Sequence, residues 1–168
     1  MSNLSGVTLR LGEPADAPAL ARLRYEFRAS YGSTTEPEAD FLARCTMWMA
    51  DHLAPGNSWR CWVAEESTQL IGLVWLHVIE KLPNPVEEPE SHGYISSLYV
   101  VSSRRNAGVG SCLLERCVRA CVDEGVDAVI LWPTPDSRNL YGRYGFAVRD
   151  DLLERRLGPT LSDTGTAA

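Results

Sequence analysis

The stretch ISSLYVVSSRRNAGVGSCLL, from Ile95 to Leu114, decides how the rest of the chain is interpreted. An apolar strand pattern over residues 94–101 meets a short polar break, and a helical pattern begins directly after Gly110. Glycines at such a turn let the backbone approach a ligand closely. The first amides of a helix lack acceptors within the helix and lie at the positive end of its dipole. The stretch therefore predicts a pyrophosphate-binding site.

Two familiar phosphate-binding loops do not match it. A Walker A loop ends in Gly-Lys-Ser/Thr, whereas serine and cysteine follow Gly110 here. A dinucleotide-binding fingerprint needs a third glycine where this chain has Leu113. The pattern that remains is Arg105-x-x-Gly108-x-Gly110 after a strand that ends in an apolar pair.

A second motif follows the next apolar run, residues 129–132. It is LYGRYGF at residues 140–146, a Leu-Tyr pair shortly before Gly-Phe. In this order and at this spacing, the two motifs resemble those of the GNAT superfamily of N-acetyltransferases. The resemblance extends from about Val7 to Leu157, and its sharp motifs lie within residues 94–146.

The resemblance implies an α/β (α+β) fold, a single GNAT domain over residues 1–157. Its central sheet is mixed, mostly antiparallel, with about six to seven strands flanked by about four helices. Apolar periodicity places strands at residues 7–11, 59–65, 70–79, 94–101, 127–132, 146–149 and 152–157. It places helices at residues 13–29 and 37–53, from the glycine loop to Gly125, and from Thr134 to Gly145. Residues 158–168 are expected to form a disordered C-terminal tail.

Composition excludes several classes of protein. The net charge is −6 without a basic stripe, which argues against nucleic acid as a partner. No apolar run approaches the roughly 20 residues of a membrane span. The first residues lack a signal-peptide pattern, so we expect a cytoplasmic location. Five cysteines without a C-x-x-C spacing predict no metal site, although Cys117 and Cys121 could form half of one, and Cys112 could be a nucleophile.

The resemblance further implies acetyl-coenzyme A as co-substrate. GNAT proteins pair its pantetheine arm with the strand before the loop, so the Leu98 N–H is expected to polarise the thioester carbonyl. Thr134 stands where many relatives have an asparagine that contacts pantetheine. The expected cofactor-binding residues are Leu98, Tyr99, Val100, Arg104, Arg105, Asn106, Ala107, Gly108, Val109, Gly110, Ser111, Thr134 and Tyr141.

Two further side chains are candidates for proton transfer. By resemblance, Tyr141 protonates the leaving thiolate, and the alternative is a core aromatic residue. Many relatives place a glutamate base near the start of the strand before the loop, where this chain has His92 and Tyr94. His92 is the candidate base, with a surface histidine as the alternative reading. His77 or a water-bridged Glu65 are further candidates.

The predicted activity is acetyl transfer to a primary amine by direct attack in a ternary complex. The acceptor is a small molecule or a protein N-terminus, and a homodimer is possible. Glu87, Glu88 and Glu90 would favour a cationic acceptor, or simply form a solvated loop. A non-catalytic acyl-coenzyme A-binding regulator and an enzyme with a longer acyl donor remain the alternatives.

Overall fold

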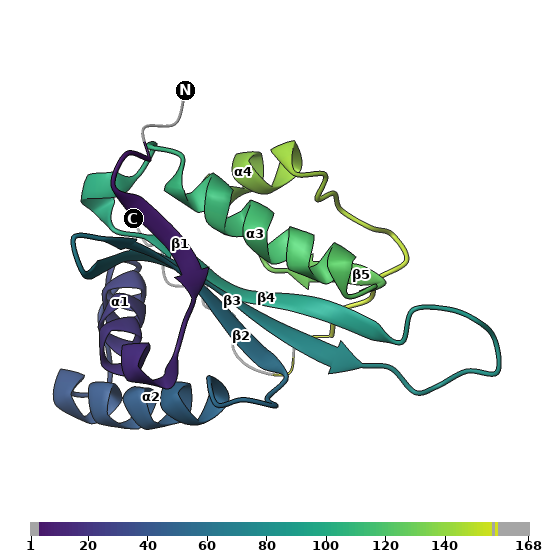
Figure 1. The fold of residues 1–168 in the computed structure, drawn as a ribbon, viewed down its shortest axis with the longest axis horizontal. Helices are drawn as coiled ribbons and strands as arrows, with labels where there is room; N and C mark the ends of the chain where they lie inside the picture. Colours follow the sequence, from purple (N-terminus) through teal and green to yellow (C-terminus); the bar gives the residue numbers. More distant parts are fainter. Residues whose placement is uncertain (1–3, 156, 158–168) are drawn as a thin grey trace, which may run out of the picture. The chain divides into compact units, whose positions relative to one another are not determined.

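The computed structural model describes residues 4–155 and residue 157. The chain divides into two compact units, Met1–Trp132 and Pro133–Ala168. The first unit is built on one five-stranded sheet with helices on both of its faces (Figure 1). This arrangement confirms the predicted α/β class.

The strands of the sheet follow one another in chain order. They are β1 (Val7–Leu11), β2 (Trp59–Glu66), β3 (Gln69–Glu80), β4 (Ser91–Val100) and β5 (Ala128–Leu131). The first four pair antiparallel, whereas β4 and β5 pair in parallel. The parallel pair requires a crossover connection, which α3 (Val109–Asp123) provides. The sheet is therefore mixed and mostly antiparallel, as predicted.

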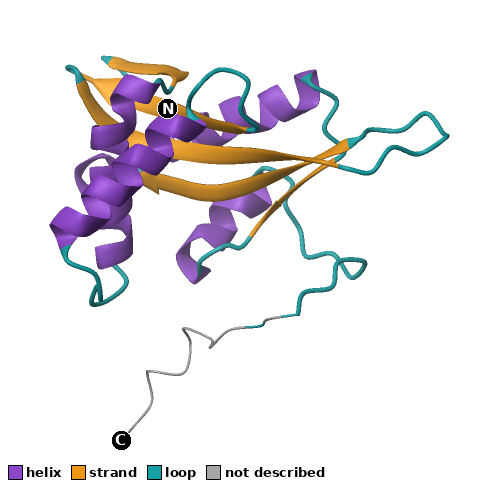
Figure 2. Cartoon of the chain, turned by 90° about the horizontal axis from the view of Figure 1, so that it is seen from below, coloured by secondary structure: helices purple, strands orange, loops and turns teal. Residues whose placement is uncertain are grey.

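Two helices, α1 (Ala17–Ala29) and α2 (Glu38–His52), lie on one face of this sheet, and α3 lies on the other (Figures 1 and 2). Their apolar stripes form the core. Leu20, Leu73 and Tyr99 belong to the cluster beneath α1 and α2. A Cβ added to Gly72 would lie 3.1 Å from the Leu113 side chain, so glycine at this position lets α3 approach β3 closely.

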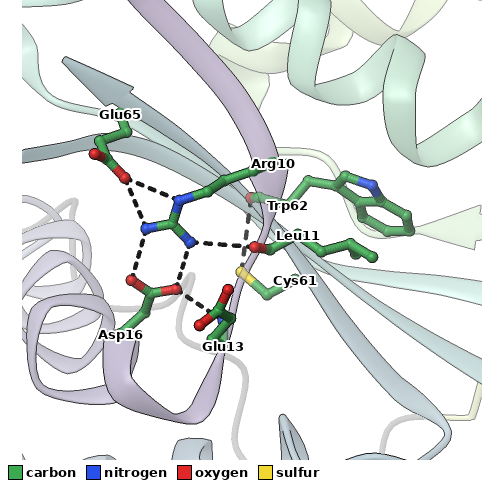
Figure 3. Close-up of polar contacts among 7 residues, drawn as sticks. All are labelled: Arg10, Leu11, Glu13, Asp16, Cys61, Trp62 and Glu65. Atoms are coloured by element: carbon green, nitrogen blue, oxygen red, sulfur yellow. Dashed lines mark hydrogen bonds and ion pairs between the residues drawn. The ribbon is translucent and has the colours of Figure 1, made fainter. Parts of the chain in front are cut away.

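An arginine network ties the first strand to its neighbours (Figure 3). The Arg10 guanidinium donates two hydrogen bonds to the Asp16 carboxylate, at 2.7 and 2.9 Å. Its Nε donates to Glu65 on β2 at 2.9 Å. The hydrogen bonds from Arg10 lower the pKa of the Asp16 carboxyl. The network therefore joins β1, β2 and the 3₁₀ turn η1 (Pro14–Asp16) through a largely buried carboxylate.

The second unit begins with the 3₁₀ turn η3 (Pro135–Ser137) and the helix α4 (Arg138–Arg143). The strands predicted at residues 146–149 and 152–157 are wrong, because the described part of these segments contains no strand. Val148 and Leu153 are 90% and 94% exposed, so the apolar residues that suggested strands have no buried face to stabilise one. The sheet accordingly has five strands instead of six or seven, and the predicted tail at 158–168 lies outside the described residues.

Within the described part of the chain, no helix is both long enough and apolar enough to span a membrane.

Candidate functional site

A β-bulge interrupts β4 next to the residues predicted to bind the cofactor. Trp75 on β3 pairs with Ser97 and Leu76 pairs with Ile95, which leaves Ser96 without a partner. The parallel pairing of β4 with β5 ends at Ile95, where the last pair is formed. Beyond the bulge, this edge of β4 carries no paired strand among the described residues. Bulges are frequent beside active sites because they redirect a strand.

The amides of the second half of β4 point alternately to its two edges. Val101 N–H donates to the Ile71 carbonyl at 2.9 Å, which places the Val101 amide on the β3 side. Because amides alternate along a strand, the N–H groups of Leu98 and Val100 point to the opposite edge. That edge is the one that β5 no longer covers. The predicted donor, Leu98 N–H, is therefore directed to a free edge of the sheet.

The glycine loop forms the start of α3 as predicted. The 3₁₀ turn η2 (Ser102–Arg104) precedes it, and Gly108 is the N-cap residue with φ of 90°, a left-handed conformation that favours glycine. The Arg105 amide already donates to the Ser102 carbonyl, and the Cys112 amide donates to Gly108.

Between these two bonds lie six consecutive amides, residues 106–111, that have no acceptor among the described residues. An uninterrupted run of backbone donors at a helix N-terminus is suited to an anion. Arg105 is among the residues predicted to bind the cofactor, but its backbone amide already donates to the Ser102 carbonyl. The amides that are left to bind an anion are therefore those of residues 106–111.

The two arginines of the loop are held by protein groups. Arg104 forms an ion pair with Glu66 at the end of β2. Arg105 Nε donates to the Val100 carbonyl at 3.1 Å, and its guanidinium lies 5.7 Å from the centre of the Tyr99 ring. Both guanidinium groups therefore already have partners within the protein, and neither is a free group for a phosphate.

His92 lies at the opposite end of β4 from the loop. Its Nδ1 is buried without a hydrogen-bond partner among the described residues and is 3.9 Å from Asp127 Oδ2. Lys81 donates to the same Asp127 oxygen at 3.1 Å. Leu98 is six positions after His92 along β4, about 20 Å at ~3.3 Å per residue. The structure does not bring these two candidates together, so a base at His92 could reach an amine beside Leu98 only through a chain of waters.

The other candidate bases have structural partners. The His77 ring stacks on Trp59 with 4.4 Å between ring centres, and its Nε2 is 3.0 Å from Ser58 Oγ. Glu65 is held by Arg10. The acidic loop of residues 81–90 is organised by Lys81, whose Nζ donates to the Pro89 carbonyl at 2.9 Å.

Thr134 and Tyr141 belong to the second unit. Thr134 Oγ1 donates to Ser137 Oγ at 3.0 Å within the turn before α4. Tyr141 is buried on α4, and its ring meets the Phe146 ring edge-on at 5.6 Å between centres. The contact explains the LYGRYGF motif locally, because the chain turns back after α4 and Phe146 packs on the tyrosine.

A polar contact between α1 and β4 was not predicted from the sequence. Arg24 Nη1 donates to Ser97 Oγ at 2.7 Å, and burial lowers the pKa of the arginine. Ser97 is directly opposite Trp75, whose indole Nε1 is buried without a partner in the described structure. The sequence does contain an indication that Arg24 faces the core, since it falls between Leu20 and Phe27 on the apolar stripe of α1.

The described residues contain no group of three or more His, Cys, Asp or Glu side chains that could hold a metal ion. All five cysteines are free thiols. The hydrogen bond with Cys121, together with burial, raises the pKa of the Cys117 thiol, which keeps it protonated. Cys117 and Cys121 thus behave as core residues of α3.

Comparison with known proteins assigns the chain to a protein family. A family model described as the acetyltransferase (GNAT) family matches residues 20–146. A solved structure of a predicted acetyltransferase with acetyl-CoA from Clostridium acetobutylicum is similar, with 26% identity and a TM-score of 0.75 over 90% of this chain and 96% of that one. A GCN5-related N-acetyltransferase from Ralstonia eutropha JMP134 is similar with 27% identity and a TM-score of 0.74, over 91% of this chain and all of that one.

A ribosomal-protein-alanine N-acetyltransferase from Brucella melitensis shares the fold, with 19% identity and a TM-score of 0.66 over 90% of this chain and 99% of that one. Among curated proteins, no sequence matches this chain significantly.

Proposed function

Since the chain belongs to the acetyltransferase (GNAT) family, we propose that it transfers an acetyl group from acetyl-CoA to a primary amine by direct attack in a ternary complex. The observation that carries this proposal is the row of free amides at residues 106–111 beside the free edge of β4. The first feature suits a pyrophosphate, and the second suits an extended chain with amide groups of its own. A similar structure from Clostridium acetobutylicum was solved with acetyl-CoA.

In this proposal, the backbone of residues 98–100 holds the pantetheine arm, with the Tyr99 ring fixing the strand from its other side. The resemblance to GNAT proteins adds Thr134 and Tyr141 to the proposed cofactor-binding residues. Arg104 and Arg105 add positive charge beside the amides without binding the pyrophosphate through free guanidinium groups. Bound acetyl-CoA supplies an activated thioester carbonyl.

The reaction then requires three contributions from residues of the chain: stabilisation of the negative charge on the carbonyl oxygen, a proton for the leaving thiolate, and an acceptor for the amine proton. The acceptor nitrogen forms a bond to the carbonyl carbon, and Leu98 N–H stabilises the negative charge that develops on the carbonyl oxygen. The carbon–sulfur bond breaks, and the Tyr141 hydroxyl gives its proton to the leaving thiolate. The proton of the attacking amine passes to His92 through water, or the acceptor binds as the free amine and the proton that it loses after attack restores the neutral Tyr141 hydroxyl. The products are an acetamide and coenzyme A.

The identity of the acceptor is also a proposal. The acceptor is a small-molecule amine or a protein N-terminus. The Brucella melitensis relative acts, by its name, on a ribosomal protein, but its 19% identity shows the fold alone. The catalytic domain over residues 1–157, the cytoplasmic location and a homodimer stay predictions.

Steady-state kinetics with a panel of amines tests the proposal. Coenzyme A release is measured while acetyl-CoA and the acceptor are both varied. A ternary complex gives double-reciprocal lines that intersect, whereas parallel lines would indicate an acetylated enzyme and contradict direct attack. Acetyl-CoA binding without amine-dependent release would favour the non-catalytic regulator. A parallel series of acetyl-, propionyl- and butyryl-CoA identifies a longer acyl donor by its higher kcat/KM.

A further inference from the structure

The guanidinium of Arg24 is half-buried between α1 and β4 without a carboxylate to pair with among the described residues. Other arginines, at positions 10, 44, 60, 104 and 149, each form an ion pair with an acidic side chain. Arg24 instead has one hydrogen bond, to Ser97 Oγ, and lies 5.6 Å from the centre of the Phe27 ring. A charge taken partly out of water is costly unless an opposite charge accompanies it.

The groups around this arginine are hydrogen-bond donors. Ser97 is buried and accepts from Arg24, which leaves its own hydroxyl hydrogen to donate. Trp75, its cross-strand partner on the same face, has a buried indole N–H without an acceptor in the described structure. Arg28, one turn further along α1, adds a second positive charge that lowers the pKa of Arg24. A set of donors with positive charge, and without a paired carboxylate among the described residues, is complementary to an anionic oxygen group.

The location ties this donor set to the proposed reaction. Ser97 directly precedes Leu98, whose N–H is directed to the free edge of β4. The bulge at Ser96 changes which face the following side chains take. Gly93 faces Cys121 on α3, whereas Ser97 and Tyr99 contact Arg24 and Phe27 on α1. A group bound by Arg24 would therefore lie on the α1 side of β4, beside the strand segment whose Leu98 amide is directed to the free edge.

We propose that the acceptor carries a carboxylate or phosphate near its amine and that Arg24 binds this anion. The inference rests on the acetyltransferase function proposed above and names the class of its substrate. It adds an anionic group to the cationic acceptor that the acidic loop was predicted to favour. Glu88 Oε1 in that loop accepts a hydrogen bond from Asn84 Nδ2 at 2.6 Å and lies 3.8 Å from Lys81 Nζ. Its negative charge is therefore partly compensated within the loop. The guanidinium would repel a polyamine.

Matched acceptors test the proposal on the full-length protein. Each of the twenty common L-amino acids is compared with its amide, and aminoalkylphosphonates are compared with alkylamines of the same length. We expect kcat/KM to be at least tenfold higher for the acids. The amino-acid pairs and the phosphonate pairs show which anion is preferred. Equal or lower kcat/KM for the acids would overturn the proposal.

The variant Arg24→Gln should reduce the acid-to-amide ratio of kcat/KM at least tenfold, mainly through KM, because the anion loses its charged donor. Arg24→Lys should keep part of the ratio, since a charge remains without the planar fork. Arg22→Gln is the matched control, because Arg22 is an exposed arginine of the same helix outside this donor set, and its ratio should stay within twofold of the parent. An unchanged ratio in Arg24→Gln would contradict the proposal.

A binding experiment separates this inference from the proposed function. N-Acetylated amino acids and their amides are titrated by calorimetry into the parent and Arg24→Gln proteins saturated with coenzyme A, which requires no turnover. Preference for the acid that disappears in Arg24→Gln supports the anion site. Acids that bind no better than amides contradict it. Failure of every amine to release coenzyme A would instead contradict the acetyltransferase function.

Discussion

Tyr141 has the most demanding role of any single residue in the proposed reaction. The leaving thiolate gains from a proton at the moment its bond breaks, and a phenol holds its proton at neutral pH. We expect Tyr141→Phe to lower kcat by about 10²–10⁴, the usual contribution of a general acid. Phenylalanine keeps the edge-on contact with Phe146, so the melting temperature should change little.

Tyr144→Phe is the control for this prediction, because Tyr144 is a partly exposed phenol just after the same helix. It should keep kcat within about threefold. If Tyr141→Phe also retains kcat within that range for the best acceptor, the tyrosine is a core aromatic residue and does not protonate the leaving group.

The role of His92 is tested by substitution. If His92 removes the amine proton through water, His92→Gln should lower kcat/KM by about 10²-fold. His77→Gln is the comparison, since His77 stacks on Trp59 and contacts Ser58, so its loss should affect stability more than kcat/KM. Unchanged kcat/KM in His92→Gln would rule His92 out.

At the scale of a single element, the start of α3 determines cofactor binding. Gly110→Val places a branched side chain among the free amides without requiring a left-handed backbone. We expect it to weaken acetyl-CoA binding at least tenfold, about 1.4 kcal/mol, measured by calorimetry. Gly108→Val should have the same effect and should also destabilise the helix start, where φ is 90°.

Gly125 provides the control at the other end of α3. It has φ of 68°, and a Cβ at this position would meet no atom within 4 Å. Gly125→Val therefore repeats the backbone strain of Gly108→Val at a site away from the amides. It should lower the melting temperature and leave the affinity for acetyl-CoA unchanged. Unchanged affinity in Gly110→Val would remove residues 106–111 as the anion site.

At the scale of the whole molecule, the network around Arg10 makes global stability depend on pH. The pKa of Asp16 is lower in the folded chain than in the unfolded one, because Arg10 donates to its carboxylate. The stabilisation is therefore complete above the unfolded value near 3.9 and is lost as pH falls toward the folded value. Asp16→Asn should remove this part of the acid sensitivity and cost about 1 kcal/mol at neutral pH, the upper end for a partly exposed pair.

Chemical denaturation from pH 7 down to pH 3 measures this effect. The exposed pair Arg149–Asp151 supplies the control, because Asp151→Asn should leave the free energy of unfolding unchanged within error. Equal pH dependence in the parent and in Asp16→Asn would show that the network does not contribute to global stability.

Much of the fold was predictable because its signals are local. The β4–loop–α3 segment is marked by an apolar run, by glycines and by helical periodicity within twenty residues, and the structure confirms each part. The late strands were not predictable, because a segment with strand-like apolar residues forms a strand only where a partner and a buried face exist. The exposed Leu153 lacks the buried face.

The family, the α/β class and the loop with its row of unpaired amides could be predicted from the sequence, since these depend on residues that are neighbours in the chain. The bulge at Ser96, the direction of the Leu98 amide and the contact of Arg24 with Ser97, 73 residues away, are seen only in the folded chain. The same holds for the hydrogen bond from Arg10 to Glu65. These features depend on contacts between residues that are far apart in the chain and adjacent in the sheet, and no local sequence pattern specifies such contacts.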